Sequence, residues 1–318
     1  MVYKYAVQQV EIPIITSGDL WFNHQEVYEK VAGLSKDIRI VLDLQSEAPS
    51  LHSIGLVTLF SDLAVDPDLV YVTRWANPVE QVPFKIIDRP KISYFFWHSQ
   101  GYDRAISTTT ARFDYGMFCG RRTWARCGMV YDAFNSLADR CLFSVMNTKV
   151  PLPWQRQSLG IDLEAHDAWL SQQGQQWWEN CPIVSLDNSS VGDHYADQES
   201  DYRLNKNILD HYHDFKIEIV METFCRGDTF LPTEKTVRAL LAGKAMIVYG
   251  PRYFLQRLRN LGFKTWNTCW DESYDELEGH ARWVAMSRVL QQSNAVDPCI
   301  AQHNQNTLKD VIGQYGPK

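Results

Sequence analysis

Long apolar runs are absent from this sequence. No stretch approaches the roughly 18 uninterrupted apolar residues that a membrane span needs. The first residues, Met1 to Tyr5, also lack the apolar core of a signal peptide. We therefore expect a cytoplasmic protein without a membrane span.

Metal and cofactor patterns are missing as well. The seven cysteines are scattered and never spaced C-x2-C, so the sequence predicts neither a disulfide framework nor a structural zinc site. It contains no P-loop, no G-x-S-x-G and no G-x-G-x-x-G motif. We expect no metal ligands and no bound cofactor.

Excess positive charge is also lacking, because 38 acidic residues outnumber 31 basic ones and give a net charge of −7. This balance argues against a protein coated in positive charge for nucleic acid. Local basic surfaces remain possible, since arginines cluster in two places: Arg104, Arg112, Arg121, Arg122 and Arg126, then Arg252, Arg257 and Arg259.

What the sequence does contain is a repeated alternation of strand and helix patterns. Such alternation predicts an α/β protein with parallel sheets and helices on both faces, here in two domains divided near residue 110. Strands are expected at 5–12, 38–42, 69–73, 92–97, 115–119, 141–146, 216–221, 245–249 and 263–266. Helices are expected at 23–34, 123–135, 164–178, 234–242, 253–261 and 274–292.

The segment Thr233-Glu234-Lys235-Thr236 opens one of these helices, directly after a strand that ends in Glu222 and a polar loop. Thr233 is a suitable N-cap. A helix N-terminus presents N–H groups and partial positive charge that favour a phosphate, and Lys235 adds a full charge. Taken alone, the same segment is also typical of a capped surface helix with a charged first turn.

The order of motifs around this segment carries a resemblance. A strand ending in Glu222 is followed by the Thr-Glu-Lys helix, an apolar strand and the turn Gly250-Pro251, then by the segments 261–265 and 271–275. Across 218–275 the chain resembles the donor-binding region of fucosyltransferase-like (alpha-1,3-fucosyltransferase-related) glycosyltransferases of bacteria and their phages. The resemblance implies a GT-B-like fold, in which two Rossmann-like domains face each other across a cleft.

This fold would place an acceptor-side domain at 1–110, a nucleotide-sugar-binding domain at 111–285 and a C-terminal helix at 286–318 that crosses back to the first domain. The resemblance implies that Glu234 holds the ribose of the donor and Lys235 its diphosphate. An arginine would be the second diphosphate anchor, with Arg126 the first candidate and Arg121 the second. The candidate donor-binding set is completed by Glu222, Thr233, Arg238 and Gly250.

Inverting sugar transfer needs a base for the acceptor hydroxyl. Asp43 and Glu47 follow an apolar strand near its carboxyl end, and the resemblance favours Glu47 because a glutamate after such a strand is the proposed base of the family. Asp19 and His98 are reserve candidates. The resemblance also implies that the chemistry is metal-independent.

The expected function is therefore a glycosyltransferase that moves a sugar from a nucleoside-diphosphate donor to a hydroxyl acceptor, such as a glycan. One alternative is a phage-type enzyme that glycosylates a hydroxylated DNA base, which would need a basic groove and a flipped base. The other is a non-catalytic nucleotide-binding sensor or assembly protein. The sugar, the nucleotide base and the acceptor stay open.

Overall fold

The computed structural model describes residues 9–14, 23–44, 51–52, 55–74, 81–88, 111–119, 124–145, 181, 183, 186, 208, 210–222, 230–277, 279–292 and 295–315. The chain divides into two compact units. The first comprises Met1–Lys91 with the short segments Trp154–Gly160 and Asp228–Leu231, and the second comprises the rest. We expected the division near residue 110, and the main segment of the first unit ends at Lys91.

The first unit contains a four-stranded parallel sheet in the order β1-β2-β3-β4, which is also their order along the chain. Its elements are β1 (Gln9–Ile14), α1 (His24–Ala32), β2 (Arg39–Leu44), α2 (Leu56–Asp62), the 3-10 turn η1 (Pro67–Leu69), β3 (Val70–Arg74) and β4 (Lys85–Asp88). Neither α2 nor β4 was predicted, because each is a short segment without a long periodic pattern.

One face of this sheet is apolar. Ile12, Leu42 and Val72 pair across β1, β2 and β3 and are fully buried. Side chains alternate along a strand, so the next set of partners, which includes Asp43 and Thr73, points to the other face.

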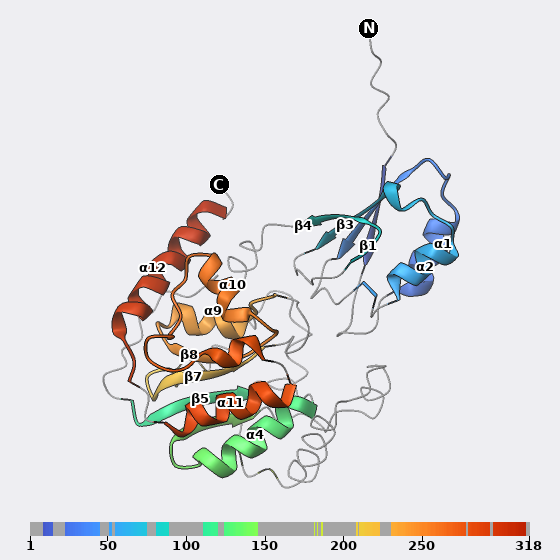
Figure 1. The fold of residues 1–318 in the computed structure, drawn as a ribbon. Helices are drawn as coiled ribbons and strands as arrows, with labels where there is room; N and C mark the ends of the chain where they lie inside the picture. The colour runs from blue at the N-terminus through green and yellow to red at the C-terminus, as the bar shows by residue number, and fades with distance from the viewer. Residues whose placement is uncertain are drawn as a thin grey trace. The chain divides into compact units, whose positions relative to one another are not determined.

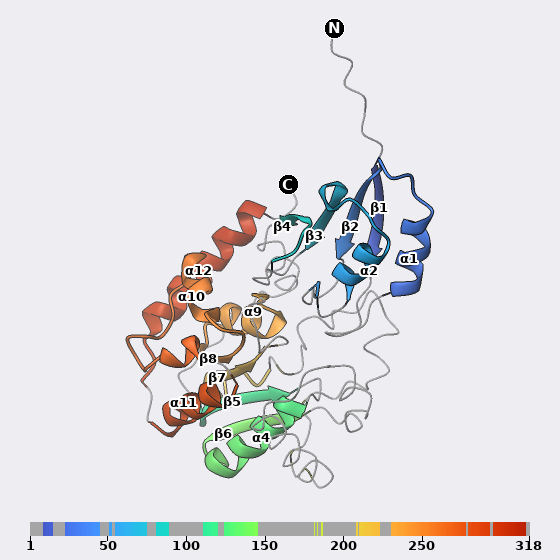
Figure 2. The same ribbon diagram turned by 45° about the vertical axis from the view of Figure 1, so that its right-hand side comes forward.

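The described α-helices of the first unit, α1 and α2, lie on a single face of its sheet (Figures 1 and 2). Strands that follow one another in sequence order are joined by crossovers of one hand, which place successive helices on the same side. Figures 1 and 2 show α1 and α2 on the same side of the strands. The expectation of helices on both faces is therefore wrong for the described helices of this unit.

The second unit contains another four-stranded parallel sheet, in the order β6-β5-β7-β8. Its strands are β5 (Phe113–Cys119), β6 (Cys141–Val145), β7 (Phe215–Met221) and β8 (Ala245–Tyr249). Almost every residue of β7 and β8 is buried. Such strands are covered on both faces, which explains their nearly continuous apolar sequences.

Helices cover both faces of this second sheet, as Figures 1 and 2 show. Among the described residues, these helices are α4 (Trp124–Leu137), α9 (Glu234–Leu241), α10 (Phe254–Asn260), α11 (Gly279–Gln291) and α12 (Pro298–Tyr315), with a 3-10 turn η3 (Ser273–Glu276). On one face the Trp283 indole of α11 donates to the Asp132 carboxylate of α4, at 2.7 Å. On the other face the Gln305 amide of α12 donates to the Leu241 carbonyl of α9, at 2.8 Å.

In its described parts the chain is thus a mixed α/β protein with two parallel sheets, compatible with Rossmann-like domains. The GT-B arrangement of the two units stays a prediction, as does the crossing of a C-terminal segment 286–318 to the first unit. Residue 286 falls inside α11, and α12 packs against α9 of its own unit. The predicted strand at 92–97 and the predicted helix at 164–178 lie outside the described residues.

The predicted strand at 263–266 is wrong, because no strand forms there. The main-chain N–H of Lys264 donates to the Asn304 side chain, and the Lys264 carbonyl accepts from the same side chain, both at 2.8 Å. One asparagine of α12 therefore takes the hydrogen bonds that a neighbouring strand would have made.

A polar network lies in the core of the second unit, between β7 and α9. The Arg238 guanidinium pairs with the Glu218 carboxylate at 2.9 Å, and the Tyr212 hydroxyl donates to the same carboxylate at 2.6 Å. Arg238 also donates to the Tyr212 oxygen. Burial alone would lower the pKa of Arg238, but Tyr212 and Glu218 outweigh it and raise this pKa.

Lys244 is a second buried cation in this unit. It lies between α9 and β8 and donates to the Phe215 carbonyl at 2.6 Å. Burial lowers the pKa of Lys244 to about 8, against the attraction of Glu218 and Asp214. The folded chain therefore binds this proton less tightly than the unfolded chain does.

This pKa predicts how stability changes with pH. The protonated Lys244 destabilises the fold below pH 8, and the penalty disappears as the pH rises towards the ordinary value of 10.5. The free energy of unfolding should rise from pH 8 to pH 10 by up to about 1.4 kcal/mol per pH unit from this group. Urea unfolding of Lys244→Met should lack this rise.

Burial also raises the pKa of the Cys141 thiol, so this group opposes the trend above its ordinary value of 9.0, and the raised pKa values of Tyr212 and Tyr274 oppose it at still higher pH. These three groups are the same in Lys244→Met, so the difference between its pH profile and that of the wild type reports Lys244. Lys309→Met, which changes an exposed lysine of α12, should keep the wild-type pH profile. Identical profiles for Lys244→Met and the wild type would contradict the assignment.

Candidate functional site

The carboxyl edge of the second sheet contains its topological switch point. The chain passes from β5 to β6 on one side and from β7 to β8 on the other, so α4 and α9 leave the sheet on opposite faces (Figures 1 and 2). Open α/β sheets bind ligands outside the carboxyl ends of their strands at such a point. Most of the loop residues after β5 and β7, at 120–123 and 223–229, lie outside the described residues.

Glu222 follows β7 at this edge, and its side chain is almost completely buried. Its carboxylate turns towards the start of α9. It accepts from the main-chain N–H of Thr233 at 3.1 Å, from the Thr233 hydroxyl at 2.5 Å and from the Thr236 hydroxyl. Glu222 thus anchors α9 to the end of β7.

Thr233 occupies the N-cap position of α9, as predicted, but its hydroxyl does not cap the helix. That hydroxyl donates to Glu222 instead. The Glu222 carboxylate therefore adds a buried negative charge at the amino end of α9, beside Glu234 in the first turn, and the helix dipole favours both.

Glu234 and Lys235 form the first turn of α9. The Lys235 ammonium contacts the Glu234 carboxylate at 2.6 Å and donates to the Thr233 hydroxyl oxygen at 3.1 Å. Their side chains are 28% and 13% exposed, in contrast to the buried Glu222 and Thr233. A cation at a helix N-terminus with partial access to solvent can attract a phosphate group.

Arg126 reaches the same point from α4, on the opposite face of the sheet. Its guanidinium donates to the Glu222 carbonyl at 2.8 Å, and its side chain is buried. The structure therefore brings Arg126, Glu222 and Thr233 together at the switch point. Arg121, the second candidate arginine, lies outside the described residues.

Arg238 lies one turn along α9 from Lys235 but faces the core. Its side chain is only 2% exposed, and its charge is matched by Glu218 in the network described above. A contact between Arg238 and a donor stays a prediction.

Gly250 lies beside Glu222 at the sheet edge, because the preceding residues Met221 and Tyr249 are paired in the β7–β8 ladder. A Cβ at Gly250 would come within 3.2 Å of the Phe254 ring. Glycine thus lets the turn after β8 pass close to α10.

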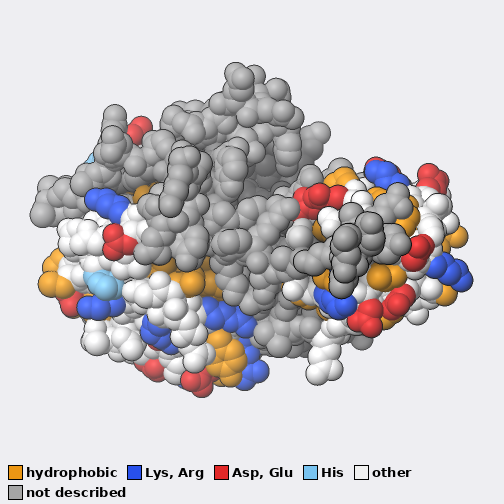
Figure 3. Space-filling view, turned by 90° about the horizontal axis from the view of Figure 1, so that it is seen from above, with side chains coloured by type: hydrophobic (Ala, Val, Ile, Leu, Met, Phe, Trp, Pro, Cys, Tyr) orange, Lys and Arg blue, Asp and Glu red, His pale blue; other side chains and the backbone are white. Residues whose placement is uncertain are grey.

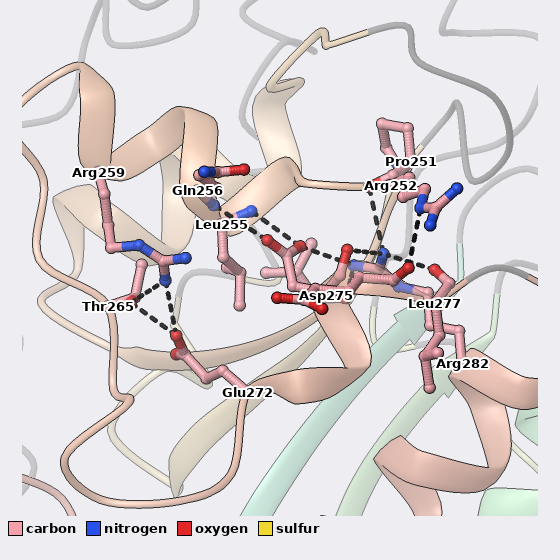
Figure 4. Close-up of polar contacts among 12 residues, drawn as sticks. Pro251, Arg252, Leu255, Gln256, Arg259, Thr265, Glu272, Asp275, Leu277 and Arg282 are labelled. Carbon is pink, nitrogen blue, oxygen red and sulfur yellow. Dashed lines mark hydrogen bonds and ion pairs between the residues drawn. The ribbon is translucent and has the colours of Figure 1, made fainter.

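A carboxylate–arginine clamp holds the turn after β8, and sequence reasoning did not identify it (Figure 4). The Asp275 carboxylate accepts from the main-chain N–H groups of Leu255 and Gln256, both at 3.0 Å. Arg282 of α11 donates to Asp275 at 3.3 Å and to the Pro251 carbonyl at 3.2 Å. We name Asp275 and Arg282 the Asp275–Arg282 clamp.

No local pattern could have identified Arg282, because it binds carbonyls from separate segments, such as those of Val248 and Leu277. Asp275 belongs to the segment 271–275 that contributes to the resemblance, but no pattern indicated that it would cap α10.

Glu272 from the same segment fixes the loop before η3. It accepts from the Thr265 hydroxyl at 2.6 Å and from Arg259 at 3.0 Å (Figure 4). It also accepts from the main-chain N–H of Trp266 at 2.8 Å. Burial raises the pKa of Glu272, while these hydrogen bonds oppose the rise. The described part of the segment 271–275 thus acts largely as a scaffold for α10 and its flanking turns.

On the first unit, Asp43 lies near the carboxyl end of β2. It is 5% exposed and accepts from the Thr73 hydroxyl of β3 at 2.7 Å. The other base candidates, Asp19, Glu47 and His98, lie outside the described residues, and their roles stay predictions.

On the face that Figure 3 shows, basic and acidic side chains are interspersed over the described residues. None of the helices in the described part of the chain combines the length and apolar character needed to cross a bilayer.

Comparison with known proteins adds no family assignment. No protein-family model matches the chain, and the search of curated proteins finds no match.

The geometry around Glu222 predicts a large effect of Glu222→Gln on stability. The substitution removes a buried negative charge that accepts three hydrogen bonds, from the Thr233 N–H and from the Thr233 and Thr236 hydroxyls. It also places an amide N–H₂, which is a donor, against groups that are themselves donors. We expect the free energy of unfolding in urea to fall by about 2–4 kcal/mol. Glu276→Gln, at an exposed glutamate of η3, should change it by less than about 0.5 kcal/mol. Equal effects of the two substitutions would show that Glu222 is no anchor.

Proposed function

We propose that this chain is a glycosyltransferase that binds a nucleoside-diphosphate sugar at the carboxyl edge of its second sheet. The observation that carries the proposal is the partly exposed Lys235 in the first turn of α9, at the switch point of a parallel sheet. The resemblance of the segment 218–275 to fucosyltransferase-like enzymes supports the same site.

In this proposal the diphosphate of the donor lies against the start of α9. Lys235 would exchange its contact with Glu234 for a phosphate oxygen, because a diphosphate carries more negative charge than one carboxylate. Glu234, released from the ion pair, would accept hydrogen bonds from the ribose hydroxyls. Glu222 and Arg126 would act by holding α9 and the end of β7 in place.

The proposed reaction is inverting and needs no metal. An acceptor hydroxyl oxygen forms a bond to the anomeric carbon of the sugar while the bond from that carbon to the diphosphate breaks. A carboxylate of the first unit takes the hydroxyl proton, and the positive charge of Lys235 stabilises the departing diphosphate. Asp43 and Glu47 are the proposed alternatives for the base, with His98 in reserve. The GT-B arrangement, in which the two units face each other across a cleft, belongs to this proposal.

Lys235→Ala tests the donor site. Isothermal titration calorimetry with GDP, UDP, CDP and dTDP should show one nucleotide that binds the wild type, and the variant should bind it at least tenfold more weakly. Lys309→Ala, on the exposed side of α12, is the matched control and should bind as the wild type does. If Lys235→Ala binds the nucleotide with wild-type affinity, the donor site is not at Lys235.

The choice of base can be tested by separating catalysis from binding. Asp43→Asn and Glu47→Gln each remove a proton acceptor without removing the donor site. The variant that changes the true base should lose about 100-fold or more in kcat for sugar transfer, while its affinity for the nucleotide stays within twofold. If both variants keep wild-type kcat, neither carboxylate is the base.

A further inference from the structure

Tyr253 has an unusual backbone conformation. Its φ is +60°, in the left-handed region, and among the described residues only Ala64 shares a positive φ without being glycine. A tyrosine in this region is strained, and such strain persists where the surroundings impose it. Tyr253 occupies the N-cap position of α10, where an extended conformation is usual.

The Asp275–Arg282 clamp imposes this conformation. The main-chain N–H of Tyr253 donates to the Asp275 carbonyl at 2.7 Å, while the Asp275 carboxylate holds the next two available N–H groups of α10. Arg282, which is fully buried, binds both Asp275 and the Pro251 carbonyl that precedes the strained residue (Figure 4). The turn is therefore held on both sides of Tyr253.

The Tyr253 ring is not part of the core. The residue is partly exposed, and the guanidinium of the exposed Arg252 lies 5.1 Å from the ring centroid. Arg252 is itself held, because its Nε donates to the Glu276 carbonyl at 2.8 Å. The strained turn thus presents an aromatic ring with a neighbouring cation instead of packing that ring inside the unit.

Tyr253 lies at the same edge of the sheet as Lys235. The strands β7 and β8 are parallel neighbours, and α9 and α10 start from their carboxyl ends. Both helices lie on one face of the sheet (Figures 1 and 2). A ligand that places its phosphates at α9 would have the turn after β8 as its neighbour.

We infer that the Tyr253 ring is the stacking platform for the nucleobase of the donor. The inference rests on the proposed function, since it extends the diphosphate site at Lys235 to the base. A nucleobase is flat and aromatic, and stacking on an aromatic side chain does not require a particular base. The adjacent Arg252 contributes a cation to the same stack.

Two substitutions at Tyr253 separate the ring from the backbone. Tyr253→Phe keeps the aromatic face, so its affinity for the nucleoside diphosphate should stay within about twofold. Tyr253→Gly removes the ring and also relieves the positive φ. We expect it to bind the nucleotide at least tenfold more weakly, without a loss in the free energy of unfolding.

Inorganic pyrophosphate is the probe for the diphosphate subsite alone. Its affinity, measured by competition with the nucleotide, should be unchanged in Tyr253→Gly and lowered in Lys235→Ala. The inference fails, and the proposed function stands, if Lys235→Ala loses affinity for the nucleotide while Tyr253→Gly keeps wild-type affinity. It fails as well if Tyr253→Gly weakens pyrophosphate and nucleotide equally, because the ring then acts only through the turn. If no nucleoside diphosphate binds the wild type, the proposed function falls and the inference falls with it.

Discussion

The hydrogen bonds of the buried Glu222 hold together the switch-point edge of the second unit. The Glu222 side chain, at the end of β7, accepts from Thr233 and Thr236 at the start of α9, and the main-chain carbonyl of Glu222 accepts from Arg126 of α4. A buried charge is tolerated only where donors replace the water that it has lost. The positions of strand end, helix start and arginine are therefore coupled, because moving one leaves a buried group without its partner.

The helices α9 and α10, which begin at the carboxyl ends of β7 and β8, differ in the hydrogen bonds at their amino ends. In both, a carboxylate from outside the helix accepts a hydrogen bond from its start. At α10, Asp275 takes two main-chain N–H groups and is itself bound by the buried Arg282. At α9, Glu222 bonds to Thr233 and to a hydroxyl of the first turn, and Lys235 adds a partly exposed cation. Because Asp275 already takes two main-chain N–H groups of α10, the proposed phosphate lies at α9, and α10 supports the turn that carries Tyr253.

Much of the fold was predictable from local patterns. The strand β8 was predicted with its observed bounds, and β7 and α9 were each placed within one residue at either end. These segments combine apolar runs or helical spacing with clear capping and turn residues, so local preference and tertiary packing agree. Segment 263–266 has aromatic residues at both ends but forms no strand, because Asn304 of α12 binds the backbone of Lys264 from forty residues away in sequence.

The candidate site shows where prediction from the sequence ends. The Thr-Glu-Lys segment, its place at a helix start and the strand that ends in Glu222 follow from residue order and from the rules for helix N-termini. The separate roles of those residues do not follow from residue order. Glu222 became an anchor, Arg238 became a partner of Glu218 in the core and Lys235 remained accessible, although all three carry charge beside the same strand and helix. Burial and the identity of distant partners decide these roles, and both exist only once β7, α4 and α9 are packed together.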